Sequence, residues 1–183
     1  ETENDTVIDG GDLGRDRRLY YRELVARFGH HPAITWNLGE ETNLSTTQLK
    51  AAANYIRGLD PYDSFICVHN HLNETDSTYD PLLGFTNFEG PSVQKWYGGM
   101  HDEVVEHRQD SIDSGHRWVV MADEIAPASV GVPDDYETAD YTQDDIRKEV
   151  LYGALLGGAG GVEWYFGDED VTAEDYRKWD TWW

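Results

Sequence analysis

Pairs of acidic residues follow two of the extended apolar segments of the sequence. Glu40–Glu41 comes after the segment 33–38, and Asp123–Glu124 comes directly after the segment 118–122. In parallel α/β folds, catalytic and binding groups gather where strands end. Two carboxyl groups on either side of a glycosidic bond can hydrolyse it, because one protonates the leaving oxygen while the other attacks the sugar or activates water. The pattern therefore predicts glycoside hydrolysis.

Side-chain alternation along a strand helps to choose within each pair. Counting in twos from Asn37 places Glu41 on the same face and Glu40 on the opposite face. We therefore expect Glu41 and Glu124 to be the catalytic carboxyl groups. Glu40 and Asp123 stay open as alternatives, since bulges re-aim side chains at strand ends.

Polar and aromatic residues at other strand ends are suited to holding a sugar. His69 and His71 follow or end the extended segment 64–69, and Trp164 and Tyr165 lie in the segment 162–166. Aromatic rings pack on the apolar faces of a sugar while its hydroxyls bind polar groups. We expect the substrate to be bound by Asn37, Glu40, His69, His71, Trp164 and Tyr165.

The two histidines also allow a different chemistry. His69 and His71 are two residues apart, a spacing compatible with a pair of metal ligands. No third ligand stands out in the sequence, so we favour hydrogen bonds to the substrate and expect neither a metal nor a cofactor. A metal-dependent hydrolase that uses these histidines and a nearby acid is kept as an alternative.

Helical and extended patterns alternate along the chain. Apolar stripes predict helices that contain residues 21–28, 49–56, 93–104 and 143–156, with a last helix over 172–183. Extended runs predict strands over 33–38, 64–69, 82–88, 118–122 and 162–166, and a loop over 72–81. Trp96, Tyr97 and Trp118 are expected in the core.

This alternation specifies a parallel sheet covered by helices. Five strands are too few for a closed (β/α)8 barrel, which usually needs about 250 residues. We therefore expect one α/β domain over residues 1–183, either an open doubly wound sheet or part of a barrel. The glycine run 157–161 lacks the ending of a phosphate loop, and we expect it to permit close approach of a helix to the sheet.

The charge balance is strongly acidic. The chain carries 36 Asp and Glu against 14 Lys and Arg, a net charge of −22, and only four of the basic residues are lysine. Such a surface repels nucleic acids and anionic membranes, so we expect neither as a partner. It also repels itself in dilute buffer, whereas concentrated salt screens the repulsion. We therefore expect a protein adapted to high salt.

The cysteine count and the hydropathy of the sequence exclude an internal disulfide and a transmembrane span. Cys67 is the only cysteine, so the chain cannot form an internal disulfide. No run approaches 18 consecutive apolar residues, so no transmembrane span is expected. No signal peptide is visible, and the polar opening segment indicates a mature or excised piece.

Several long motifs resemble one enzyme family. The motifs are Asp9–Gly14, Arg18–Leu24, Ala26–His31, Trp36–Glu41, Asp60–Asp63, Pro81–Gly84, Trp118–Val120 with Asp123–Glu124, and Gly160–Gly167. They resemble secreted glycoside-hydrolase barrels that carry an N-terminal domain of unknown function and a collagen-binding-type C-terminal domain. These barrels look related to the apiosidase-like barrels, which are of the clan A type.

The resemblance implies an extracellular, retaining (β/α)8 barrel enzyme that acts on a poly- or oligosaccharide. The acid/base would lie at the end of the fourth barrel strand, which maps onto Glu41. The nucleophile would lie at the end of the seventh strand, which maps onto Glu124. The aromatic residue under the sugar, on the eighth strand, maps onto Trp164.

The chain departs from the family pattern at its start. It begins just before the helix that leads to the fourth strand, so we expect only the C-terminal part of the barrel, strands 4–8 with their helices. An open parallel sheet exposes an unpaired edge. We therefore expect association with a second copy or with the missing barrel half. A non-catalytic carbohydrate-binding or assembly module is the main alternative.

Overall fold

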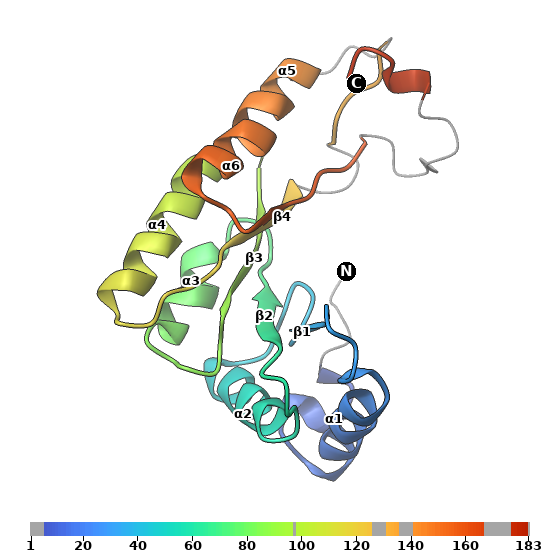
Figure 1. Cartoon of the computed structure of the whole chain (residues 1–183), viewed down its shortest axis with the longest axis vertical. Helices are drawn as coiled ribbons and strands as arrows, with labels where there is room; N and C mark the ends of the chain where they lie inside the picture. The colour runs from blue at the N-terminus through green and yellow to red at the C-terminus, as the bar shows by residue number, and fades with distance from the viewer. Residues whose placement is uncertain (1–5, 97, 126–130, 136–140, 167–176, 183) are drawn as a thin grey trace. The chain divides into compact units, whose positions relative to one another are not determined.

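The computed structural model describes residues 6–96, 98–125, 131–135, 141–166 and 177–182 (Figure 1). Within these ranges, strands and helices alternate along the chain. The chain divides into two compact units, one formed by residues 1–91 and 110–118 and the other by residues 92–109 and 119–183. Among the described residues, no helix has both the length and the apolar character needed to span a bilayer.

The first unit contains two long helices and two strands. After a short 3-10 turn, η2 (Asp9–Gly11), its elements in chain order are α1 (Arg15–Phe28), β1 (Thr35–Asn37), α2 (Thr46–Arg57), β2 (Phe65–His69), α3 (Thr75–Tyr79) and the 3-10 turn η3 (Asp80–Leu82). β1 and β2 pair in parallel, with Trp36 opposite Ile66. Helices α1 and α2 lie side by side at the bottom of Figure 1.

Local sequence explains where these two helices begin. The Asp9 carboxylate accepts hydrogen bonds of 2.9 Å from the backbone amides of Asp16 and Arg17, which lack partners within the first turn of α1. Ser45 caps α2 through a reciprocal capping box with Gln48. The Gln48 amide also donates to Asp12 at 2.9 Å, so this cap ties α2 to the segment before α1.

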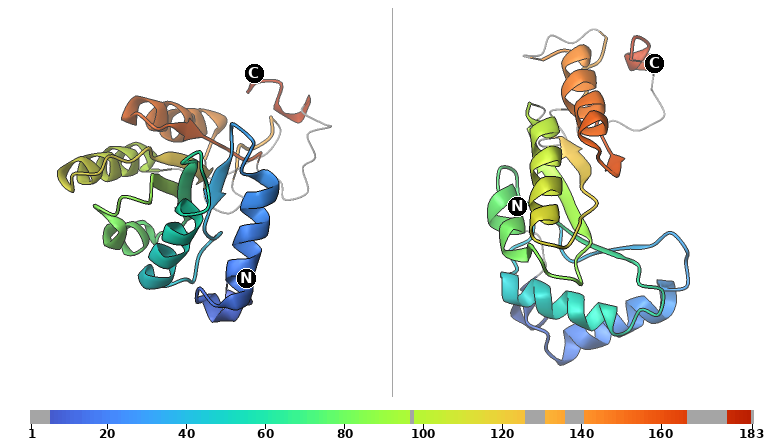
Figure 2. Two further views of the ribbon diagram at one scale, coloured as in Figure 1. Left: turned by 60° about the horizontal axis from the view of Figure 1, so that its bottom comes forward. Right: turned by 60° about the vertical axis from the view of Figure 1, so that its left-hand side comes forward.

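Among its described residues, the second unit contains three strands, two longer helical segments and a 3-10 turn at 177–179. Its elements in chain order are β3 (Gly90–Lys95), α4 (Met100–Asp113), β4 (Met121–Ile125), a long helix and β5 (Gly161–Val162). The long helix consists of α5 (Gln143–Ile146), the π-helical η5 (Arg147–Tyr152) and α6 (Gly153–Gly157). The first two residues of β3 and the last turn of α4 belong to the first unit. Strand β4 pairs in parallel with β3 and with β5. Figure 2 shows the α5–α6 helix beside α4.

The glycine run was expected to permit close approach of a helix to the sheet, whereas Gly157 allows close approach of α6 to another helix, α4. A Cβ on Gly157 would lie 3.2 Å from the His101 carbonyl oxygen and 3.2 Å from Val104. The carbonyl of the same glycine accepts a hydrogen bond of 2.5 Å from Arg108. This contact packs the backbone of α6 directly on α4.

The strands form a five-stranded parallel sheet in the order β1-β2-β3-β4-β5, so the α/β prediction is confirmed. β1 and β5 are the outer strands, and the sheet is not closed into a barrel. The strand order never reverses, unlike that of a doubly wound sheet.

The early elements follow the sequence prediction closely, and the middle ones do not. The helices predicted around 21–28 and 49–56 and the strands at 33–38 and 64–69 are confirmed. The loop expected over 72–81 is instead α3 and η3, and the strand expected over 82–88 lies at β3 (Gly90–Lys95). Val93, which was predicted to begin a helix over 93–104, is therefore part of a strand, and the helix begins at Met100. Val93 is apolar because it is buried in the sheet, and not because it lies on one face of a helix.

The later elements show smaller differences. β4 begins at Met121, three residues after the predicted start of the strand. The helix predicted over 143–156 is confirmed, with the π-helical turn inside it. The last predicted helix falls mostly outside the described residues, which include only a 3-10 turn at 177–179. Trp118 is buried as expected, Trp96 is 41% exposed and so is not a core residue, and Tyr97 lies outside the described residues.

Candidate active site

The ends of β1 and β2 stay together beyond the strands. His69 donates its backbone amide to the carbonyl of Gly39 at 3.0 Å, and Thr42 donates to the carbonyl of His69 at 3.3 Å. The segment that carries Glu40 and Glu41 is therefore fixed against the carboxyl end of β2. Five residues predicted for the site therefore lie at or just beyond the ends of these two strands. They are Asn37, Glu40, Glu41, His69 and His71.

Glu40 contacts two other predicted residues. Its Oε2 atom accepts a hydrogen bond of 2.9 Å from the side-chain amide of Asn37. Its Oε1 atom lies 3.4 Å from Nε2 of His69, whose side chain is 3% exposed, whereas that of Glu40 is 52% exposed. A carboxylate held by two neighbours and still open to solvent is placed to meet a ligand.

Glu41 contacts the second histidine. Oε2 of Glu41 lies 3.9 Å from Nδ1 of His71, and both side chains are partly buried. The backbone of Glu41 has φ 42°, in the left-handed region that non-glycine residues rarely adopt. Such a conformation costs about 1–3 kcal/mol and is found mainly where the surrounding structure fixes a functional group. The two histidines thus contact different carboxylates.

Side-chain alternation does not hold past the end of β1. It grouped Asn37 with Glu41, but the Asn37 amide binds Glu40. The physical reason is that the strand ends at Asn37 and the chain then bends, so the period of two no longer applies. Either glutamate of the pair is therefore available as a catalytic group.

A buried polar cluster supports the loop that carries His71. The side-chain amide of Asn70 donates to the carbonyl of His71 at 2.7 Å, and its oxygen accepts from the hydroxyl of Tyr79 at 2.8 Å. Asn70 and Tyr79 are both fully buried. These bonds fix the turn after β2 against the helix that follows.

In the second unit, Asp123 and Glu124 lie within β4 and not beyond its end. This corrects the expectation that they follow the strand, and the reason is the shift of the strand by three residues. Asp123 accepts a hydrogen bond of 2.5 Å from the hydroxyl of Ser92. Glu124 is in register with Gln94 of β3, across a bulge that follows Val93. Both acids are partly buried.

Ser92 and Gln94 are polar residues that the sequence analysis missed. Both are buried on β3, next to the acidic pair of β4. The misplaced strand hid them, although the order Ser92-Val93-Gln94 alternates polar and apolar residues as a strand does. Lys95, which ends β3, forms an ion pair with the buried Glu103 of α4.

The predicted aromatic residues follow β5. The ring of Trp164 lies 5.8 Å from that of Trp182, and the guanidinium of Arg147 lies 4.7 Å from the centre of the Trp182 ring. The carbonyl of Tyr165 accepts a hydrogen bond of 2.7 Å from Val132. Trp164 and Tyr165 are both partly buried.

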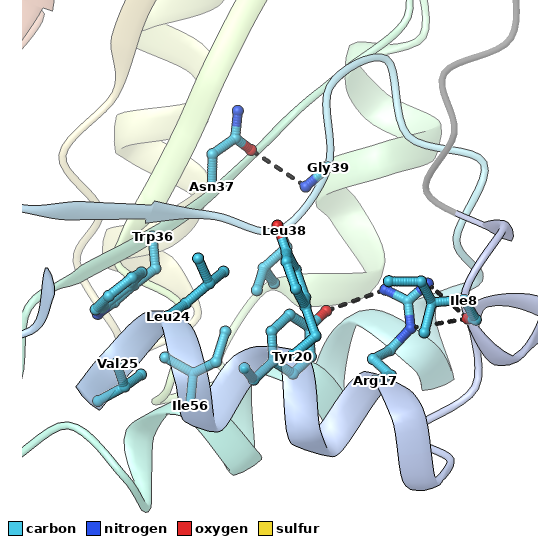
Figure 3. Close-up of a pocket in the computed structure, with 11 residues that line it drawn as sticks. Ile8, Arg17, Tyr20, Leu24, Val25, Trp36, Asn37, Leu38, Gly39 and Ile56 are labelled. Carbon is cyan, nitrogen blue, oxygen red and sulfur yellow. Dashed lines mark hydrogen bonds between the residues drawn. The ribbon is translucent and has the colours of Figure 1, made fainter. Parts of the chain in front are cut away.

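Two of the cavities formed by the described residues belong to the first unit. A cleft of about 440 Å³ is lined by residues after β1, the start of α2, His71 and α3. A smaller cavity of about 250 Å³ lies between α1, β1 and α2 (Figure 3). Figure 3 shows Trp36 on the side of β1 that faces these helices and Asn37 pointing to the other side. The smaller cavity is mostly apolar, and its Arg17 already binds Tyr21 and the carbonyl of Ile8.

Comparison of the sequence with models of protein families and with curated proteins gives no match.

Proposed function

We propose that this chain is a retaining glycoside hydrolase module that cleaves a glycosidic bond in a poly- or oligosaccharide. The observation that supports it best is the pair of contacts at the ends of β1 and β2, where Glu40 lies within 4 Å of His69, the last residue of β2, and Glu41 within 4 Å of His71, just after it. Carboxylates in polar surroundings at the carboxyl ends of parallel strands suit acid/base work on a bound sugar. The resemblance of the motifs to glycoside-hydrolase barrels points to the same reaction.

In the proposed mechanism, Glu124 attacks the anomeric carbon and the glycosidic C–O bond breaks. Glu41 gives its proton to the leaving oxygen, so the leaving group departs as an alcohol. Glu41 then takes a proton from water, whose oxygen attacks the anomeric carbon and releases Glu124 as a carboxylate. Two inversions give retention, which requires the two carboxyl groups to lie about 5–5.5 Å apart during the reaction.

The remaining residues of the proposal bind the sugar. Asn37, Glu40, His69 and His71 supply hydrogen-bonding groups, and Trp164 and Tyr165 supply aromatic surface. The exposed fraction of Glu40 is larger than that of Glu41, and its Asn37 contact suits a group that orients sugar hydroxyls. The mechanism needs no cofactor.

We propose further that the sheet is the part of a (β/α)8 barrel that contains strands 4–8. The unreversed strand order supports this proposal, because a barrel has all its crossovers in one direction. β1 and β5 are outer strands, and outer strands readily pair with another chain. A second copy or the remaining barrel strands would cover them, and light scattering that finds only monomer in molar salt would argue against a homodimer.

The excess of 36 acidic over 14 basic residues supports adaptation to salt and argues against nucleic-acid or membrane partners. An extracellular location is proposed from the resemblance alone. The test is a screen of aryl glycosides and neutral oligosaccharides in molar salt. Wild-type protein is compared with Glu124→Gln, which keeps the shape of the side chain and removes the nucleophile. Proton NMR of the first product formed reports the anomeric configuration.

The proposal expects hydrolysis with retention, and loss of at least about 99% of the rate in Glu124→Gln. Binding of sugars without turnover, equal in the two proteins, would indicate a carbohydrate-binding module. A rate that is lost after treatment with a chelator and restored by added zinc or manganese would indicate the metal-dependent alternative. Inverted product would contradict the retaining mechanism.

A further inference from the structure

The cleft of about 440 Å³ in the first unit lies next to Glu41. Thr42, the residue after Glu41, is part of its wall. His71, which lies 3.9 Å from the Glu41 carboxylate, is another part. The cleft and the proposed acid/base therefore share a boundary. Its volume is within the range of about 300–1,000 Å³ that ligand pockets span.

The walls of the cleft carry mainly polar groups. Hydroxyls come from Thr42, Thr46, Ser77 and Thr78, and an amide comes from Asn43. A hydroxyl has one donor and two acceptor positions, so it can hold a ligand while bonded elsewhere. The hydroxyl of Ser77, for example, donates to the carbonyl of Glu74, which leaves its lone pairs as acceptors.

These groups favour a sugar over an apolar ligand. A sugar ring offers many hydroxyls that can bind the side chains of the walls, while Leu44 and Leu49 supply a small apolar area for its C–H groups. An aryl group would displace water from the polar walls without replacing its hydrogen bonds, which is unfavourable. An anionic sugar would be repelled by the carboxylates of Glu74 and Glu41.

We propose that this cleft is the leaving-group subsite, which binds the neutral sugar unit that departs when the bond is cleaved. The inference rests on the proposed function with Glu41 as acid/base, because that residue protonates the leaving oxygen and the leaving group must lie against it. The natural substrate is then a chain of neutral sugars, and not a single sugar carrying an apolar group.

The test fills the cleft and compares two leaving groups. Ser77→Trp places an indole in the cleft from α3. Thr47→Trp is the matched control, since Thr47 is exposed on α2 and does not line the cleft. Each variant is assayed with a neutral trisaccharide that the wild type cleaves and with the glycosyl fluoride of the same sugar. Fluoride departs without protonation and occupies no sugar subsite.

We expect Ser77→Trp to lower kcat/KM for the trisaccharide at least about tenfold. For the glycosyl fluoride, the same variant should lower kcat/KM less than about twofold. Thr47→Trp should change neither value by more than about twofold. Equal loss on both substrates, or no loss on either in Ser77→Trp, would overturn the inference. Thermal unfolding of both variants checks that the fold is kept.

A second measurement separates failure of the inference from failure of the proposed function. If the wild type cleaves no substrate, saturation-transfer NMR is recorded with cellotriose, xylotriose and mannotriose. Binding by wild type and Thr47→Trp, lost in Ser77→Trp, would assign the cleft as a sugar site although hydrolysis had failed. Absence of binding by the wild type to all three sugars would overturn the inference.

Discussion

The Nε2 atom of His69 lies 3.4 Å from Oε1 of Glu40, which joins the ends of two neighbouring strands. The amide of Asn37 holds the other oxygen of the same carboxylate at 2.9 Å. Glu40 is therefore already bound on both oxygens, whereas Glu41 contacts one histidine at 3.9 Å. Glu40 is the more exposed side chain, at 52% against 30% for Glu41, but both of its oxygens already contact other side chains. A general acid/base must present an oxygen to the leaving group. We therefore propose Glu41 as the acid/base and Glu40 as a binding group.

Glu41→Gln should lower kcat by about 10²–10⁴-fold on substrates with poor leaving groups, as expected for loss of a general acid. Azide should restore part of the rate with an activated aryl glycoside and give a glycosyl azide of retained configuration, because the small anion replaces the deprotonated water. Chromatography of the products measures this.

Glu40→Gln is the matched comparison for that experiment. It should raise KM more than it lowers kcat, and azide should have no effect. A glycosyl azide formed by Glu40→Gln and not by Glu41→Gln would exchange the two roles.

Asp60 is expected to stabilise the first unit. Its carboxylate is buried and accepts hydrogen bonds from Trp36 Nε1 at 2.9 Å and from the backbone amides of Tyr62 and Ser64 at 3.0 Å. Asp60→Ala should reduce the free energy of unfolding by about 2–3 kcal/mol, since hydrogen bonds to charged groups contribute most. Urea unfolding in molar salt measures the change, and Glu106→Ala, at an exposed position of α4, is the control.

The same residue predicts a pH dependence. Burial raises the pKa of Asp60, but the hydrogen bonds from Trp36, Tyr62 and Ser64 outweigh it and hold the pKa below its ordinary value of 3.8. The stabilisation is therefore present above pH 3.8 and is lost as the pH falls below this value. The difference in unfolding free energy between wild type and Asp60→Asn should be larger at pH 6 than at pH 3. An equal difference at both pH values would contradict this.

Salt should stabilise the whole chain. A net charge of −22 destabilises the compact state in dilute buffer, and the Debye length falls to about 3 Å in 1 M salt. The Tm should rise steeply between dilute buffer and molar KCl, as measured by circular dichroism. Sucrose at the same osmolality is the control for exclusion of solute from the surface. A Tm that is as high in dilute buffer as in molar KCl would disprove adaptation to salt.

Gly131 is expected to support the aromatic residues after β5. A Cβ at this position would lie 2.2 Å from the carbonyl oxygen of Tyr165, too close for any side chain. Gly131→Ala should therefore disrupt the hydrogen bond from Val132 to Tyr165 and cost about 1–3 kcal/mol. The intrinsic tryptophan fluorescence should change with it, because Trp164 precedes Tyr165. Gly115→Ala, where a Cβ meets open space but φ is positive, separates steric from backbone effects.

The sequence analysis located one half of the candidate site better than the other. The sequence located Glu40, Glu41, His69 and His71 because each pair follows or ends a short apolar strand, and the helices before these strands have recognisable ends. β3 was misplaced because its buried residues, such as Val93, gave spacings that also fit a helix. Ser92 and Gln94 were missed for that reason.

Contacts past the ends of strands could not be obtained from periodicity. The hydrogen bond from Asn37 to Glu40 depends on a bend that includes the positive φ of Glu41, and no pattern of residue types predicts this bend. The bulge after Val93, which sets Gln94 against Glu124, is likewise a property of two paired strands and not of one segment.

Covalent trapping tests the two-carboxylate mechanism most directly. Wild-type protein in molar salt is incubated with the 2-deoxy-2-fluoroglycosyl fluoride of the sugar it cleaves, which forms the glycosyl-enzyme quickly and releases it slowly. Mass spectrometry of the intact chain and of its peptides then locates the label. The mechanism predicts one fluoroglycosyl group per chain, attached to Glu124 and absent in Glu124→Gln. A label on another residue, or hydrolysis with no label and inverted product, would contradict it.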